Sequence, residues 1–354
     1  MLRIVRALLL GVLLFTFVAL PVRQAAAHSA SPAGDPIFNK QGTTARQKGM
    51  FSAYFQVQGS KKKGGHPPGE EGHGDDEGHH GDEGHDDAEA HHSDEHAESD
   101  ARHAGEAFEE SDSKRLDLFL SWTPLDRVTL TLDLPWVLNG IKEFEDGERH
   151  DTSLSGFGDM ALAVSGVLWR NSDALPSTWV EGRTLVKFPT GKSRQKVDGV
   201  RDPHLQAGTG SWDFGFGLAA VHRFERVSLY SSVYYRINTE GSLDYEYGDF
   251  VLANAALQLP LGRTFGLRVL NAFTLGFELN YRWADFDEFK GARFDDSGGS
   301  ILYLTPSLRV QLPWRWEGSG LALRASVQIP ATNSWLNGFQ EEQPTWLFGI
   351  QYGF

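Results

Sequence analysis

Histidine and acidic residues gather in one stretch of the chain, between Lys61 and Asp112, and they are the side chains best suited to chemistry. Nine of the 13 histidines lie there, and a six-residue repeat that begins Glu-Gly-His recurs from Glu71. Neutral imidazole is the commonest protein ligand for Zn²⁺, Cu²⁺ and Ni²⁺, and carboxylates can complete the coordination shell. The stretch therefore predicts binding of divalent cations. The predicted ligands are His66, His73, His79, His80, His85, His91, His92, His96, His103, Asp75, Asp76, Asp82, Asp86 and Asp87.

The same stretch is strongly acidic and poor in apolar residues. Its 18 Asp and Glu outnumber its four Lys and Arg by 14, which equals the formal net charge of −14 for the whole chain. Almost no residue between 64 and 107 could enter a core, so we expect a disordered segment. Many ligands on such a segment give several weak, exchanging sites, with Zn²⁺ the first candidate and Cu²⁺ or Ni²⁺ the alternatives. The competing interpretation is a solvated acidic loop, as most charge runs are.

The N-terminus has the organisation of a secretory signal peptide. Arg3 and Arg6 precede an apolar run over 8–20, and the small residues at 25–27 form a cleavage site. We therefore expect residues 1–27 to be removed on export; an uncleaved membrane anchor is the alternative. The chain has no Cys, which excludes disulfides and thiolate metal sites. The negative net charge argues against a nucleic-acid partner, since phosphate binding needs an excess of Lys and Arg.

Outside the acidic stretch, apolar and polar residues alternate with the period of two that is typical of β-strands. At the end of the chain, Trp346, Phe348 and Ile350 share one face, while Gly349 and Gln351 occupy the other. The same pattern predicts about 12 strands. They lie near 49–60, 113–122, 126–137, 157–169, 178–189, 211–224, 226–238, 248–260, 271–285, 300–312, 319–330 and 343–354.

The connections between these strands alternate in length. After odd-numbered strands come long polar stretches, at the acidic insert and at 138–156, 190–210, 239–247, 286–299 and 331–342; after even-numbered strands the connections are mostly short. An even number of strands, short turns at one end, long loops at the other and an aromatic-rich apolar face describe a bacterial outer-membrane barrel. Closure is required because lipid cannot satisfy an exposed strand edge. The fold class predicted is an all-β, transmembrane antiparallel β-barrel.

This fold divides the chain into segments. Residues 28–48 become a periplasmic N-terminal segment, and the barrel spans 49–354, interrupted by 61–112 as the first extracellular loop. The final strand ends in Phe354 and resembles the terminal signal that the barrel assembly machinery recognises. The expected partners are therefore outer-membrane lipid, the assembly machinery and divalent cations.

Three glycine-containing stretches resemble the outer-membrane family labelled for a MetA pathway of phenol degradation. They are Gly156-Phe157-Gly158-Asp159, Phe188-Pro189-Thr190-Gly191 and Gly208-Thr209-Gly210-Ser211-Trp212-Asp213. The similarity covers roughly 115–354, and the third stretch is its most specific part. The resemblance implies a barrel and the passage of small molecules, without fixing the substrate. The His-rich insert departs from the family pattern.

Signals of catalysis are weak, and we expect no enzyme and no covalent cofactor. Gly191-Lys192-Ser193 is similar to the end of a phosphate-binding loop, but Val186 stands where the first Gly of that motif should be. His150, His204 and His222 could each meet a Ser and an acid in space, although lone histidines near strand ends are more often ordinary polar contacts.

Charged residues on the polar strand faces are expected to line the barrel interior. They are either a selectivity ring or, as we favour for most of them, a network of salt bridges across a narrow lumen. For cations, Asp133, Glu181 and Glu278 would be the attracting groups. The predicted pore-lining residues are Asp133, Glu181, Arg183, Lys187, Glu278, Arg282, Arg309 and Arg324.

The sequence thus favours an outer-membrane channel for divalent metal ions, captured by the His-rich loop. A passive channel for small organic or aromatic solutes is the second hypothesis, and a non-transporting barrel that binds or senses metal is the third.

Overall fold

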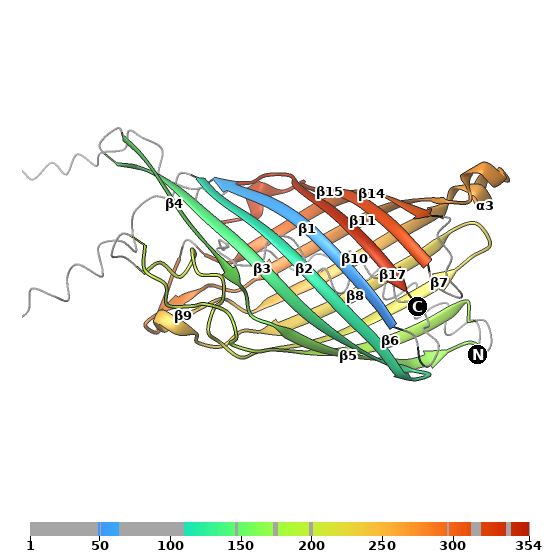
Figure 1. Cartoon of the computed structure of the whole chain (residues 1–354), viewed down its shortest axis with the longest axis horizontal. Helices are drawn as coiled ribbons and strands as arrows, with labels where there is room; N and C mark the ends of the chain where they lie inside the picture. Colours follow the sequence, from blue (N-terminus) through green and yellow to red (C-terminus); the bar gives the residue numbers. More distant parts are fainter. Residues whose placement is uncertain are drawn as a thin grey trace, which may run out of the picture.

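A computed structural model describes residues 49, 51–63, 110–145, 148–172, 176–197, 201–295, 297–312, 320–337 and 341–353. Most of these residues form one tilted wall of antiparallel strands (Figure 1). The wall strands are β1 (Phe51–Lys63), β2 (Glu110–Leu125), β3 (Val128–Glu145), β4 (Glu148–Phe157), β5 (Ala161–Arg170), β6 (Thr178–Lys187), β7 (Asp213–Arg223), β8 (Ser228–Ile237), β10 (Phe250–Pro260), β11 (Phe273–Ala284), β14 (Gly299–Leu312), β15 (Gly320–Pro330) and β17 (Thr345–Gly353).

The wall closes on itself, because β1 pairs along one edge with β2 and along the other with β17. Strands β4 and β5 share one position in the wall, since β4 pairs with the second part of β3 and β5 with the first. The predicted 12-stranded, closed antiparallel β-barrel is therefore confirmed. Closure pairs the other wall strands along both edges, which a lipid environment demands; β4 pairs only with β3 among the described residues.

The smaller elements lie at the two ends of the barrel. β16 (Glu341–Glu342) extends the edge of β1, while β9 (Tyr245–Glu246), β12 (Glu288–Phe289) and β13 (Ala292–Arg293) form a separate three-stranded sheet. The helical turns are η2 (Ser242–Asp244), α3 (Leu261–Phe265), η3 (Arg268–Leu270) and η4 (Asn333–Trp335). Among the described residues, no helix has the length and apolar character that a membrane span requires.

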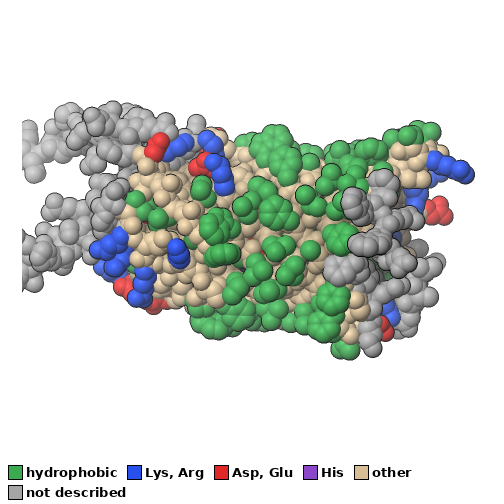
Figure 2. Space-filling view, in the orientation of Figure 1, with side chains coloured by type: hydrophobic (Ala, Val, Ile, Leu, Met, Phe, Trp, Pro, Cys, Tyr) green, Lys and Arg blue, Asp and Glu red, His purple; other side chains and the backbone are tan. Residues whose placement is uncertain are grey.

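The alternation of each strand sets which side chains face the lipid. In β17, Trp346, Phe348 and Ile350 are 59%, 53% and 48% exposed, whereas Leu347 between them is 2% exposed. Figure 2 shows the result on one side of the molecule, where hydrophobic side chains form a band across the middle and charged ones gather toward the ends. An apolar band around a closed barrel is the surface of a protein that spans the outer membrane.

The two ends of the barrel differ as predicted. The short connections 126–127 and 224–227 lie at the end that also holds the first residues of β1 and the last residues of β17. By the usual orientation of such barrels this is the periplasmic end. The longer connections, such as 188–212, lie at the opposite end.

The prediction of a long polar loop after the third strand is wrong. Instead of a polar connection over 138–156, β3 continues to Glu145 and β4 begins at Glu148, and the two pair from Trp136↔Phe157 to Glu145↔Glu148. This hairpin continues past the apolar band (Figures 1 and 2). A strand beyond the lipid has no apolar face, so its sequence lacks the alternation that marks a membrane strand.

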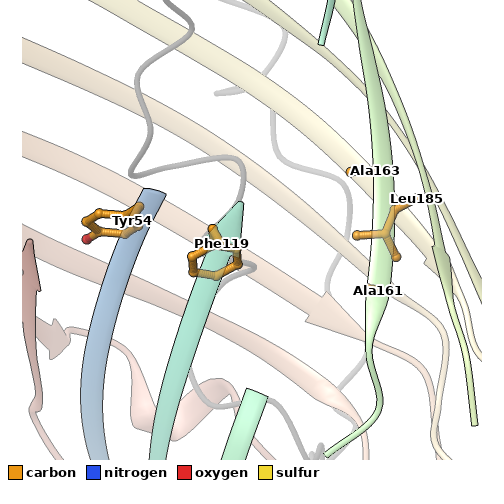
Figure 3. Packing of buried hydrophobic residues seen from close by; sticks show 5 residues of the cluster. All are labelled: Tyr54, Phe119, Ala161, Ala163 and Leu185. Atoms are coloured by element: carbon orange, nitrogen blue, oxygen red, sulfur yellow. The ribbon is translucent and has the colours of Figure 1, made fainter. Parts of the chain in front are cut away.

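Tyrosine rings lie flat against glycine backbone on the inner wall. A Cβ atom on Gly349 of β17 would lie 2.2 Å from the Tyr54 hydroxyl, and one on Gly215 of β7 would lie 1.9 Å from the Tyr234 hydroxyl. Only glycine permits this approach. The Tyr54 ring also stacks on Phe119 of the neighbouring strand, with centroids 5.9 Å apart (Figure 3). These contacts pack large aromatic side chains closely against the inner wall.

Candidate functional site

The three glycine-containing stretches meet at the break between β4 and β5. Asp159 lies in this break, and its Oδ1 accepts a hydrogen bond from the backbone nitrogen of Gly191 at 2.8 Å. Its Oδ2 accepts hydrogen bonds from the backbone nitrogen and the hydroxyl of Thr209, at 2.7 and 2.9 Å. A Cβ on Gly208 would lie 2.6 Å from Asp159 Oδ1 and 2.7 Å from the Gly191 Cα. The carboxylate therefore ties two remote segments to the wall.

Lys187 connects this carboxylate to a second one. Its Nζ lies 3.2 Å from Asp159 Oδ2 and 2.6 Å from Asp213 Oδ2. Arg236 reaches the same Asp213 oxygen at 2.8 Å, and Ser211 donates to Asp213 Oδ1 at 2.8 Å. Buried charges of this kind persist only when they are paired and hydrogen-bonded. The cluster borders a small cavity of about 100 Å³ in the half of the barrel away from the start of β1 and the end of β17.

The middle of the lumen is filled by polar side chains. Gln56, Gln58 and Asp117 are 0%, 2% and 0% exposed. Arg115 binds two carboxylates, through Nε to Asp117 at 2.5 Å and through Nη2 to Asp133 at 3.2 Å. Side chains, rather than a folded plug, therefore separate the small cavity from the periplasmic half of the lumen within the described residues.

Two further ion pairs span neighbouring parts of the lumen. Arg324 of β15 pairs with Glu278 of β11. Arg282 lies 2.7 Å from Glu342 of β16, and the Tyr303 hydroxyl donates to the second oxygen of Glu342 at 2.5 Å. Glu342 comes from the connection between β15 and β17, so this contact holds that connection against the interior.

A separate polar cluster lies outside the membrane-spanning strands. The Tyr245 hydroxyl donates to Asp287 Oδ2 at 2.7 Å and lies 3.3 Å from His204 Nε2. Burial, followed by the charge of Asp287, raises the pKa of Tyr245 well above its ordinary value. Burial also acts to raise the pKa of Asp202, but hydrogen bonds from His204 outweigh it and hold that pKa below its usual value.

All eight predicted pore-lining residues project from the inner face of the wall, and most are ion-paired. Beyond the pairs above, Arg183 lies 3.7 Å from Glu181 on the same strand. Arg309 differs, because its Nη2 donates to the neutral side chain of Gln311 at 3.3 Å. The arrangement resembles the salt-bridge network that we favoured more than a ring of one charge.

Several residues of these clusters were not predicted from the sequence. Arg115 stands two residues before Asp117, on the same strand face, and this spacing could have identified it. Glu342 lies in a two-residue strand within a polar connection, where no periodic signal marks it. Ser211 and Thr209 belong to the most specific of the three glycine-containing stretches, but nothing in the spacing indicated a contact with Asp159.

The His-rich insert, with all 14 predicted metal ligands, lies outside the described residues. The structure describes its flanks: Lys63 pairs with Glu110 as the last step of the β1–β2 ladder, at the end opposite the start of β1. The described residues contain no group of three or more His, Cys, Asp or Glu arranged to hold a metal ion. Of the lone histidines, His204 contacts Asp202 and His222 contacts Thr178.

Comparison with solved structures agrees with the architecture. The COG4313 outer membrane channel from Pseudomonas putida F1 superposes with a TM-score of 0.57 at 14% identity, over 91% of this chain and 100% of that one. This is an outer-membrane β-barrel fold. A Pseudomonas aeruginosa FadL homologue (TM-score 0.44, 9% identity, 93% and 96% coverage) and the CymD monoaromatic hydrocarbon channel (0.39, 8%, 95% and 98%) are less similar. No protein-family model and no curated protein matches the chain. The outer-membrane barrel that the resemblance implied is therefore supported by the fold, whereas membership of the phenol-pathway family is not shown.

Proposed function

We propose that the protein is a passive outer-membrane channel for a small organic solute. The observation that carries this proposal is a lumen with a cavity toward each end, and among the described residues it is side chains that lie between the two cavities. A solute would pass by diffusion as these side chains change rotamer, without covalent chemistry. The similar solved structure from Pseudomonas putida is described as an outer membrane channel, which supports the proposal.

The charge pattern of the lumen favours an organic solute over a metal ion. Asp133, Glu181 and Glu278, the acids that would attract cations, each lie beside an arginine. Such pairing cancels the field that a cation pathway requires. Buried aromatic rings also belong to the inner wall, among them Tyr54, Phe119, Tyr234, Phe250 and Tyr303. Aromatic walls interrupted by polar groups are typical of sites for small organic molecules.

Flux through reconstituted protein tests this proposal. Liposome swelling with small organic solutes should report permeation, and a Glu278→Ala/Arg324→Ala double variant should increase it, because an ion pair that projects into the lumen is removed without leaving a buried charge unpaired. The matched control is Arg293→Ala/Asp295→Ala, which removes an exposed ion pair outside the barrel wall. A wild-type barrel and a double variant that both stay impermeable would refute a channel.

We also propose metal capture by the His-rich insert as a second function. The composition of the insert supports it, and so does the position of its flanks at the end away from the start of β1, where Lys63 pairs with Glu110. A local excess of carboxylates and imidazoles would raise the concentration of Zn²⁺ at this mouth. Calorimetric titration with Zn²⁺, Cu²⁺ and Ni²⁺ should show saturable binding that is lost at pH near 5, since protons compete for imidazole with a pKa of ~6.5.

We further propose how the chain is exported and assembled. Residues 1–27 act as a cleaved signal peptide, and the strand ending in Phe354 is the segment that the assembly machinery recognises. N-terminal sequencing of the mature protein tests the first statement. Deletion of Phe354 followed by membrane fractionation tests the second.

A further inference from the structure

A cavity of about 310 Å³ opens at the periplasmic end of the lumen, and four arginines line it. Arg223 is the last residue of β7, Arg263 lies in α3, and Arg309 and Arg324 lie in β14 and β15. None of the described residues that line this cavity is acidic. We call it the arginine vestibule.

Two of these arginines face each other directly. In the β14–β15 ladder, Arg309 is the register partner of Arg324, and both project inward. Like charges placed opposite each other on neighbouring strands destabilise a sheet. Glu278 matches the charge of Arg324, whereas the hydrogen bond of Arg309 goes to an uncharged amide. The vestibule therefore carries uncompensated positive charge within a confined space.

The remaining lining indicates the kind of ligand. Tyr54 and Tyr230 contribute aromatic surface, and Ser228, Thr274 and Ser307 contribute hydroxyl groups. Arg223 lies 4.6 Å from the centroid of the Trp179 ring, so its guanidinium group is held over an aromatic face. The volume lies at the lower limit of small-molecule sites. Guanidinium groups recognise carboxylates through paired hydrogen bonds.

We propose that the arginine vestibule binds the carboxylate of a small organic acid with a flat apolar body. For its role in transport, the inference rests on the proposed function, and it then identifies organic anions as the solutes of the channel. Binding itself does not depend on transport. The Arg309–Arg324 pair holds the carboxylate, and the tyrosines contact the apolar body. The like-charge pair, which lowers the stability of the empty barrel, is neutralised when the anion enters.

The test measures binding to the full-length barrel in detergent, with benzoate, neutral benzamide and inorganic phosphate as probes. Benzoate should bind, and benzamide should bind about tenfold more weakly or worse, because it lacks the charge. Arg309→Gln should weaken benzoate binding by a similar factor, since it removes the cation that has no carboxylate partner beside it. Arg293→Gln, at an exposed arginine outside the barrel wall, is the control and should leave binding unchanged.

Charge reversal separates ligand binding from folding. Arg309→Glu places an acid opposite Arg324, so it should raise the melting temperature while abolishing benzoate binding. Equal binding of benzoate and benzamide, or wild-type affinity in Arg309→Gln, would overturn the proposal. Phosphate that binds as tightly as benzoate would overturn the assignment to organic acids. If benzoate binds as expected but no solute crosses liposomes, the channel proposal fails and the binding site stands.

Discussion

The backbone nitrogen of Gly191 donates a hydrogen bond to Asp159 Oδ1 at 2.8 Å, across 32 residues of sequence. The second oxygen of the same carboxylate accepts a hydrogen bond from the backbone nitrogen of Thr209. Asp159 thereby replaces the strand pairing that is missing at the break between β4 and β5. A single side chain holds three chain segments together on the inner wall.

Replacing Asp159 with Ala should destabilise the barrel by about 3 kcal/mol, because buried donors and part of the charge of Lys187 lose their partner. Urea unfolding in lipid vesicles, followed by tryptophan fluorescence, measures this change. Asp126→Asn, at an exposed turn residue, is the control and should behave as wild type. Equal stability of Asp159→Ala and wild type would show that Asp159 does not hold these segments.

The contact between Tyr54 and Gly349 predicts a pairwise effect. Gly349→Ala should cost about 1–3 kcal/mol, because its methyl group overlaps the tyrosine ring. In a Tyr54→Ala background the same substitution should cost much less, so a double-mutant cycle gives a coupling energy. Gly353→Ala, on the same strand, is the matched control because its Cβ would meet no heavy atom closer than 3.9 Å. Additive effects of Gly349→Ala and Tyr54→Ala would contradict the contact.

The Arg282–Glu342 pair should fix the connection that carries Glu342. Glu342→Gln leaves Arg282 buried without its counter-charge, and we expect a loss of about 3 kcal/mol together with faster proteolysis of the connection. Limited proteolysis of intact outer membranes measures the second effect. Cleavage at the wild-type rate would indicate that the ion pair does not hold this segment.

The Tyr245–Asp287 hydrogen bond predicts loss of stability at alkaline pH. Burial raises the pKa of Tyr245 above that of the unfolded chain, so its stabilising effect is complete below pH ~10 and is lost as the pH rises above that value. Tyr245→Phe removes the ionisation, and its melting temperature should fall less steeply than that of wild type above pH ~10. Parallel curves for the two proteins would show that Tyr245 does not contribute.

The flanks of the His-rich insert predict that it can be removed without harm to the barrel. Lys63 and Glu110 are already paired, so a two-residue Asn-Gly turn should connect β1 to β2 in place of residues 64–109. The variant should keep its melting temperature and its organic-solute flux and lose binding of Zn²⁺. Retention of Zn²⁺ binding would place the metal site elsewhere in the chain.

The barrel could be predicted from sequence because lipid imposes the same demand on every wall strand. In β11 and β17 each outward position is apolar or aromatic, so a period of two is visible without knowledge of the neighbours. The hairpin of β3 and β4 was missed for the same reason: around Glu145 the chain has left the lipid, and the alternation stops.

The sequence predicts that charged side chains pair inside the lumen, but it does not predict which residues form each pair. Alternation placed Glu278 and Arg324 on inner faces, but their pairing depends on the register of β11, β14 and β15, which sequence does not provide. The directly opposed Arg309 and Arg324 depend on the same register. Asp159 was recognised as part of a motif, yet its partners lie 32 and 50 residues away. Such distances exceed the reach of any local pattern.

The seam between β1 and β17 gives the barrel the connectivity of a ring. Ser52 stands beside Gly353 in that seam, so the beginning of β1 and the end of β17 are neighbours. A short peptide could join them, and the chain could instead be opened at a periplasmic turn such as 224–227. A circular permutant of this kind would keep every wall contact while changing which strand leaves the ribosome last. Its rate of insertion would reveal whether the order of synthesis or the finished ladder governs closure.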